Sequence, residues 1–387
     1  MKRQIISSAL ALSFVLGGAA ALPEGAFESQ SVTITAQAKS IQSGDYKYSL
    51  LKDGTAKIVK YKGSDTDVKI PSKIDGKKVT MIAKNAFFQN KKIKSVTIPK
   101  GVKSIGDSAF CNCTKLKTVT IPDSVTTIGT YAFQDCENLK TVTISKNVKN
   151  IGRYAFSGTK WLANKQKKNP LVIVNGILID ATKCKGKIKL PKSVKAIGET
   201  AFFDGMYGNK ELKSVTIPNS VKSIGSDAFG GCVNLKTIKI PKSVTTIGSC
   251  AFAETKWLEN KQKKNALVIV NGILIDGAEC KGKVTIPNSV KKIGSGAFRT
   301  LNNGKYTWYY DSNLNIKSVK IPDSVKTIED SAFFGCINLK TITIPKSVKT
   351  IGKDAFEGYH KNLTIKTPKG SAAAKYAKAY GIKVKYI

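Results

Sequence analysis

The stretch that decides the fold is LKTVTIPDSVTTIGTYAFQDCEN, residues 116–138. Its opening L-x-x-V-x-I pattern predicts a short strand with one apolar face, and Pro122 ends that strand because proline has no N–H for a sheet ladder. Val125 and Ile128 predict a second extended piece, and the Ala-Phe pair after Gly129 predicts a core contact. One such coil cannot bury its apolar side alone, so the pattern requires stacked copies.

Ala-Phe recurs along the chain, with its Phe at positions 87, 110, 133, 156, 202, 229, 252, 298, 333 and 356. The spacings are 23, 23, 23, 46, 27, 23, 46, 35 and 23 residues, so each is one or two periods of 23, in two cases with an insertion of four or twelve residues. A fixed period of this length predicts a solenoid whose coils stack about 4.8 Å apart around continuous apolar columns.

Units such as VTIPDSVTTIGTYAFQDCENLK and ITIPKSVKTIGKDAFEG resemble those of the BspA-like leucine-rich-repeat surface proteins of bacteria, over residues 46–387. The resemblance implies a leucine-rich-repeat solenoid, β-rich, with short strands stacked beside turns and short helices in an elongated and curved array. It also implies an exported surface protein that adheres to host matrix or to other cells, with no catalytic residues in the repeat.

We expect the solenoid to occupy residues 81–365, between a β cap at 39–80 and a second cap at 366–387. The first segment has strand-like alternation and Asp-Gly turns but lacks Ala-Phe, and the last contains a short Ala/Lys/Tyr helix followed by a strand. Both are interpreted as caps, because an open terminal coil would expose core and an unpaired strand edge.

Two double units, residues 157–202 and 253–298, are near copies 96 residues apart. Both contain TKWL and LVIVNGILID, and the Asn-Gly pair between apolar runs predicts a hairpin. We expect each double unit to replace one rung with a short helix, carrying Trp161 or Trp257, and then a hairpin. A structural variant with a core tryptophan is preferred over a protruding binding element.

Residues 1–38 have the layout of a secretory signal, in which Lys2 and Arg3 precede an apolar run. Two A-x-A cleavage sites remain open, ending at Ala21 and at Ala38. No other stretch reaches the ~18 apolar residues of a membrane span, so no transmembrane segment is expected. The sequence therefore predicts a protein that is secreted or held at the bacterial cell surface.

The chain has 61 lysines, three arginines and 26 acidic residues, a formal charge of +38. This lysine excess favours a diffuse positive field over bidentate phosphate recognition, and it argues against a sequence-specific nucleic-acid reader. Seven lysines share one repeat position, directly after the first apolar residue of the unit: Lys94, Lys117, Lys140, Lys213, Lys236, Lys317 and Lys340. Stacking predicts a column of charge, which serves either solubility or the binding of an acidic protein, a matrix component, or an anionic glycan or wall polymer.

Four of the eight cysteines share another repeat position, three residues after Phe: Cys113, Cys136, Cys232 and Cys336. The shared position predicts small buried core residues that hydrogen-bond the turn. A disulfide between Cys113 and Cys136, one rung apart, is the competing interpretation. Cys111-x-Cys113 alone is a weak metal signal, so no metal site is expected.

Catalysis has little support in the sequence. His360 is the only histidine, so a Ser-His or Cys-His catalyst would have no other base. The sequence contains no glycine-rich phosphate-binding loop. A catalytic pair of carboxylates is the one alternative that the sequence does not exclude. We expect no enzyme activity and no cofactor. The twelve-residue insertion carries Tyr306, Trp308 and Tyr309, which either fold onto the flank or offer a ligand such as a sugar an aromatic surface.

The sequence as a whole predicts non-catalytic adhesion, by binding protein or glycan. The alternative is a wall-associated structural protein held by its charge to anionic envelope polymers, and a hydrolase is a distant third.

Overall fold

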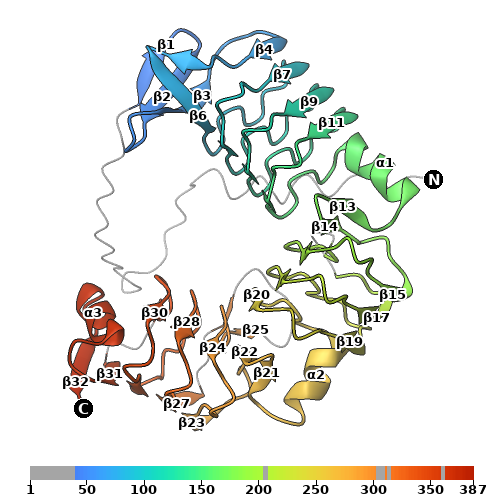
Figure 1. Ribbon diagram of the computed structural model, residues 1–387. Coiled ribbons are helices and arrows are strands. Elements are labelled where there is room, and N and C mark those ends of the chain that lie inside the picture. Colours follow the sequence, from blue (N-terminus) through green and yellow to red (C-terminus); the bar gives the residue numbers. More distant parts are fainter. Residues whose placement is uncertain (1–39, 204–207, 302–309, 312–314, 359–361) are drawn as a thin grey trace, which may run out of the picture. The chain divides into compact units, whose positions relative to one another are not determined.

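The structure is a computed structural model that describes residues 40–203, 208–301, 310–311, 315–358 and 362–387. It is a β-solenoid in which most coils contribute one longer strand and one two-residue strand, joined by turns (Figure 1). The expected repeat solenoid is therefore confirmed. The signal peptide and its two cleavage sites lie outside the described residues.

The longer strands form three parallel sheets, which we call the first, second and third repeat sheets. The first contains β4 (Asp67–Lys69), β7 (Ser95–Thr97), β9 (Thr118–Ile121) and β11 (Thr141–Ile144). The second contains β15 (Gly186–Lys189), β17 (Leu212–Thr216) and β19 (Thr237–Lys239). The third contains β23 (Gly282–Thr285), β27 (Ile316–Lys320), β29 (Thr341–Thr343), β31 (Thr364–Thr367) and β32 (Lys383–Tyr386).

The second strand of each coil belongs to three further sheets, which we call the return sheets. The first has β1 (Ile41–Ser43), β2 (Tyr46–Leu50), β3 (Ala56–Tyr61), β6 (Lys77–Ile82), β8 (Ser104–Ile105), β10 (Thr127–Ile128) and β12 (Asn150–Ile151), with β5 (Lys73–Ile74) beside β6. The second has β13 (Val172–Val174), β14 (Ile177–Asp180), β16 (Ala196–Ile197), β18 (Ser223–Ile224) and β20 (Thr246–Ile247). The third has β21 (Val268–Val270), β22 (Ile273–Asp276), β24 (Lys292–Ile293), β28 (Thr327–Ile328) and β30 (Thr350–Ile351).

Register follows the 23-residue period. Val119 of β9 pairs with Val96 on one side and with Val142 on the other, so equivalent residues of successive coils lie side by side. Within β9 the valine and isoleucine are buried and the threonines are exposed. Figure 1 shows β7, β9 and β11 as successive rungs of this ladder.

Phenylalanine rings form the centre of the core. Phe110 and Phe133 stack with centroids 5.2 Å apart, and Phe133 and Phe156 with centroids 5.4 Å apart. At the first coil Tyr61 stacks on Phe87 at 5.3 Å, and at the last coil Tyr376 meets Phe356 edge-on at 5.8 Å. Tyrosines therefore cover the ends of the phenylalanine series.

Parallel coil geometry begins before the first Ala-Phe pair. β4 and β6 pair in parallel with β7 and β8, although both strands contain residues of the segment expected to be a cap. In the same segment β1, β2 and β3 form an antiparallel meander, and β5 pairs antiparallel with β6. The coil of β4 and β6 ends in Ala86-Phe87 and is therefore the first repeat unit, whereas the coil of β3 before it lacks the signature because Tyr61 takes the place of the phenylalanine. At the other end α3 (Ala372–Ala379) precedes β32, the last strand of the third repeat sheet.

At most repeat turns glycine is favoured by close approach rather than by its backbone angles, although Ala83 and Glu329 occupy the equivalent position in two coils. A Cβ atom on Gly129 would lie 2.6 Å from the backbone nitrogen of Asp107 in the preceding coil. The left-handed residue is instead Tyr131, with φ of 58°. Coils therefore pack backbone against backbone at this corner.

The duplicated units contain the expected helix and hairpin. α1 (Lys160–Lys168) and α2 (Lys256–Gln262) begin after Thr159 and Thr255, whose side chains accept a hydrogen bond from the third helical N–H. Trp161 and Trp257 are buried, and β13 and β14 form an antiparallel pair across Asn-Gly, as do β21 and β22. The tryptophans are core residues, as expected.

The cysteines that follow the repeat phenylalanine are buried. The thiols of Cys113 and Cys136 donate to the carbonyls of Phe87 and Phe110, at 3.2 and 3.1 Å, one coil away. The expected role as core residues bonded to a turn is confirmed at both positions, and both are thiols in the structure. No helix in the described part of the chain is long and apolar enough to cross a membrane.

Candidate binding surface

The seven predicted lysines are exposed and form a column beside each repeat sheet. The backbone N–H of Lys117 donates to the carbonyl of Lys94 at 2.9 Å, and that of Lys140 to Lys117 at 3.0 Å. Lys236 donates in the same way to Lys213 at 3.1 Å, and Lys340 to Lys317 at 2.9 Å. The structure therefore brings the lysines of neighbouring coils together, in runs of three, two and two.

These ammonium groups lack carboxylate partners. Among the described residues, none of the seven forms an ion pair. The ion pairs nearest to a repeat turn join other groups, for example Lys292 and Glu329 at 3.0 Å. Lys94 lies near enough to Asp67 to contribute to the lowered pKa of that carboxyl group, and the other six lysines of the column are a source of positive charge without an ion-pair partner in the described part of the chain.

The outward positions of the first repeat sheet are mostly hydroxyl groups. Ser95, Thr118 and Thr141 form one line across the strands, and Thr97, Thr120 and Thr143 form the next. At its outer strand β4, this sheet carries one outward lysine, Lys69, and one outward carboxylate, Asp67. Asp67 accepts hydrogen bonds from Ser95 and Thr66, which lower the pKa of its carboxyl group.

The second and third repeat sheets carry lysines at the equivalent positions and, within their strands, no acidic residue. The second has four strand lysines, Lys187, Lys189, Lys213 and Lys239. The third has six, Lys283, Lys317, Lys320, Lys366, Lys383 and Lys385. The sequence interpretation missed most of these residues, although the alternating GKIK of β15 and KVKY of β32 would have revealed them.

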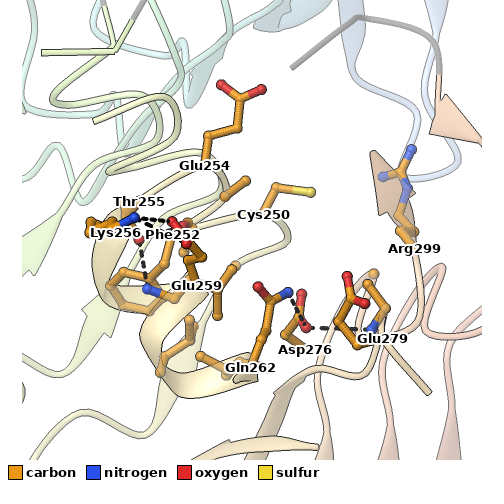
Figure 2. Close-up of a pocket in the computed structure, with 18 of the residues that line it drawn as sticks. Cys250, Phe252, Glu254, Thr255, Lys256, Glu259, Gln262, Asp276, Glu279 and Arg299 are labelled. Carbon is orange, nitrogen blue, oxygen red and sulfur yellow. Dashed lines mark hydrogen bonds and ion pairs between the residues drawn. The ribbon is translucent and has the colours of Figure 1, made fainter. Parts of the chain in front are cut away.

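A cleft of about 840 Å³ lies beside α2 and the hairpin β21–β22, and Figure 2 shows its side chains. Asp276 accepts a hydrogen bond from Gln262 of α2 at 3.0 Å, and burial raises the pKa of its carboxyl group to about 7. Glu259 pairs with Lys263 at 2.7 Å and with Lys256 at 2.9 Å, and these hydrogen bonds lower its pKa to about 2. Both carboxyl groups have structural partners.

The first copy of the duplicated unit has an equivalent cleft of about 400 Å³. Asp180 there accepts a hydrogen bond from Gln166 at 2.8 Å, and burial raises the pKa of its carboxyl group. The same aspartate and glutamine therefore tie the helix to the hairpin in both copies. The hydrogen bond between helix and hairpin therefore accounts for both buried aspartates, and no ligand is needed to explain them.

Several predicted residues cannot be placed. Tyr306, Trp308, Tyr309 and His360 lie outside the described residues. The antiparallel pair β25 (Thr300–Leu301) and β26 (Tyr310–Asp311) brackets the aromatic segment. Within the part of the chain that the structure describes, no group of three or more histidine, cysteine or acidic side chains is arranged to hold a metal ion.

The repeat geometry agrees with a family match. The model of the BspA type leucine-rich repeat region matches residues 80–206, 203–307 and 304–378, which is most of the chain. The chain belongs to the BspA-type leucine-rich-repeat family. The comparison with curated proteins gave no match.

Solved structures of three bacterial proteins are similar to this member of the family. A leucine-rich cell surface protein from Faecalibacterium prausnitzii is 27% identical over 90% of this chain and 94% of its own, with a TM-score of 0.34. A leucine-rich repeat protein from T. pallidum is 29% identical over 58% and 95%, with a TM-score of 0.35. One from Bacteroides ovatus is 23% identical over 90% and 99%, also with a TM-score of 0.35. The family assignment rests on the repeat match rather than on these superpositions.

Proposed function

We propose that this protein is a non-catalytic, secreted or surface-held binding protein that attaches a bacterium to an acidic extracellular macromolecule. The observation that carries the proposal is the lysine column, because exposed lysines of successive coils are joined by their backbone hydrogen bonds. A surface of this kind suits an elongated partner that touches several coils at once.

The electrostatic reason is repulsion within the column. Rungs lie about 4.8 Å apart, which is shorter than the Debye length of about 8 Å at physiological salt, so neighbouring ammonium groups repel each other. A polyanion that neutralises several of them relieves this repulsion and gains attraction. The partner is therefore expected to bind along the array instead of in one pocket.

In the cleft beside α2, the carboxyl groups of Asp276 and Glu259 are both held by side-chain partners, which favours a structural role for these two residues. A pair of catalytic carboxyl groups needs one acid and one base directed at a substrate. Here Asp276 accepts a bond from Gln262, and Glu259 is held by two lysines. The alternative of a wall-associated structural protein uses the same lysine column and differs only in its partner, an anionic envelope polymer of the producing cell.

The test compares two variants with the same loss of charge. Lys94→Thr, Lys117→Thr and Lys140→Thr together remove one run of the lysine column, whereas Lys73→Thr, Lys77→Thr and Lys78→Thr remove three exposed lysines of β5 and β6. Immobilised heparin, isolated wall polymer and an acidic matrix protein serve as partners. We expect the first variant to weaken binding and the second to leave it nearly unchanged. Equal effects would mean that only net charge matters, and would contradict the proposal.

A further inference from the structure

We infer that the binding surface is graded along the chain: the second and third repeat sheets form a site for an anionic polysaccharide, and the first presents a mainly hydroxyl face whose only strand charges are Lys69 and Asp67 on its outer strand. This inference rests on the proposed function and adds the location of the site and the chemical class of its ligand. It follows from the outward strand residues of the three sheets, which differ although the fold of the coils is the same.

The third repeat sheet gives the clearest arrangement. Strand pairing places Thr285, Lys320, Thr343, Lys366 and Lys385 in one line across its strands. A parallel line contains Lys283, Ser318, Thr341, Thr364 and Lys383. In the first line Thr343 separates Lys320 from Lys366, and Lys366 adjoins Lys385; in the second line only the two end strands carry lysines, with three hydroxyl residues between them. The lysine column of Lys317 and Lys340 lies directly beside them, so this sheet has three lines of positive charge.

Alternation has a physical consequence. Lysines two rungs apart are separated by about 9.6 Å, beyond the Debye length of about 8 Å, so they repel less than lysines on adjacent rungs. The surface can therefore be more cationic than a single column at little cost to folding. Hydroxyl groups between the lysines provide donors and acceptors for further hydrogen bonds.

These side chains favour a polysaccharide over other polyanions. A linear anionic glycan offers regularly spaced acidic groups with hydroxyls between them, which matches alternating lysine and threonine. Recognition of a nucleic acid uses aromatic platforms and arginine forks, whereas the strands of these two sheets contain no arginine and one aromatic residue, Tyr386. A folded acidic protein would meet this flat ladder at few points.

The first repeat sheet is the internal control. Its equivalent lines hold Thr97, Thr120 and Thr143, and its outer strand pairs Lys69 with the opposing charge of Asp67 on the neighbouring line. Only the lysine column of Lys94, Lys117 and Lys140 lies beside it. The same backbone therefore displays one line of charge here and three in the third repeat sheet.

The experiment exchanges residues between equivalent positions. The loss variant is Lys320→Thr, Lys366→Thr and Lys385→Thr, and the gain variant is Thr97→Lys, Thr120→Lys and Thr143→Lys. Each new residue occurs naturally at the same position of another coil, so the loss variant is expected to melt close to the original protein. The gain variant places lysines on adjacent rungs, and it is expected to melt at a lower temperature because these lysines repel each other. Affinity for a heparin oligosaccharide is measured for both variants and for the triple variant of Lys94, Lys117 and Lys140, with poly-glutamate and neutral dextran as comparison ligands.

We expect the loss variant to bind heparin at least about tenfold more weakly, and the gain variant to bind it several-fold more tightly, because each lysine that neutralises an anionic group adds to affinity. The loss variant should also lose more affinity than the Lys94 triple variant. Equal losses would overturn the graded surface and leave the proposed function standing. No loss in any variant would overturn both, and tighter binding of poly-glutamate than of heparin would overturn the choice of a polysaccharide.

Discussion

Phe133 shows how one residue of the repeat stabilises the whole stack. Its ring is fully buried and lies between the rings of Phe110 and Phe156, with centroids 5.2 and 5.4 Å away. Because the neighbouring coils hold both partners in place, the site cannot collapse around a smaller side chain.

Phe133→Ala is therefore expected to lower the free energy of unfolding by ~3–5 kcal/mol through loss of burial and formation of a cavity. Phe133→Leu, which keeps most of the volume, should cost clearly less. Chemical denaturation monitored by circular dichroism measures both. Cavities of this kind usually cost several kcal/mol, so a loss below about 1 kcal/mol for the alanine variant would mean that the side chain of Phe133 does not point into the core.

The buried thiols are expected to react slowly. Burial raises the pKa of Cys232 and of Cys336 to about 12, so almost no thiolate is present at pH 8. Labelling with a maleimide should be slow in the folded protein and fast after denaturation. Mass spectrometry before and after reduction is the second readout, and a disulfide joining Cys113 to Cys136 would contradict the structure.

At the scale of the element, the aspartate that joins helix and hairpin gives a pH-dependent test. The pKa of Asp276 is raised from 3.8 to about 7 in the folded protein, so the folded state binds this proton more tightly than the unfolded state. Its contribution to stability is therefore greatest below pH 3.8 and is lost as the pH rises towards 7.

Asp276→Asn keeps an oxygen that can accept the hydrogen bond from Gln262 and removes the titration. The difference in unfolding free energy between variant and original protein should therefore shift in favour of the variant as the pH rises from 4 to 8, which denaturation at several pH values measures. Glu259→Gln is the matched control: the pKa of Glu259 is lowered from 4.5 to about 2, so its contribution to stability is present above pH 4.5 and is lost only below it. This variant should therefore show almost no change between pH 4 and 8. A variant less stable than the original protein at pH 8 would show that the ionised carboxylate is itself favourable.

Most elements of this fold were predictable from sequence because the same residue pattern recurs in many units. The period of 23 located the strands, and TKWL with Asn-Gly located helices and hairpins. The expected cap boundary at residue 80 divided the coil of β4 and β6, which ends at the repeat Phe87, and the coil of β3 before it was missed because Tyr61 replaces the repeat phenylalanine there. A pattern built on one dipeptide is blind to a coil whose core is filled by another residue.

The candidate surface was only partly predictable. The position of Lys117 after a buried leucine was enough to forecast the lysine column, since every coil has the same register. The lysines within strands, such as Lys189 and Lys320, interrupt lines of threonine and follow no fixed period. Their neighbours across the sheet come from register shifts and from the double units, which the sequence alone did not align.

At the scale of the whole molecule, the structure shows where many of the 61 lysines lie, which outnumber the three arginines. Positive charge lies in the lysine column throughout, and the strand lysines add to it in the second and third repeat sheets. Under the proposed function, charge arranged in this way would attract a linear anionic partner from a distance and hold it through many weak contacts. A single substitution such as Lys117→Ala is therefore expected to change affinity little.

The most direct test of this account is the affinity of the unaltered protein for a heparin oligosaccharide across a series of salt concentrations. Binding through many lysines releases many counterions, so the logarithm of the affinity should fall linearly and steeply with the logarithm of the salt concentration. The loss variant of the third repeat sheet should show a slope smaller by up to about 3, one for each lysine removed. An affinity that does not respond to salt would contradict the account: the lysines would then serve only solubility, and recognition would lie elsewhere, with Trp308 and Tyr309 the first residues to replace.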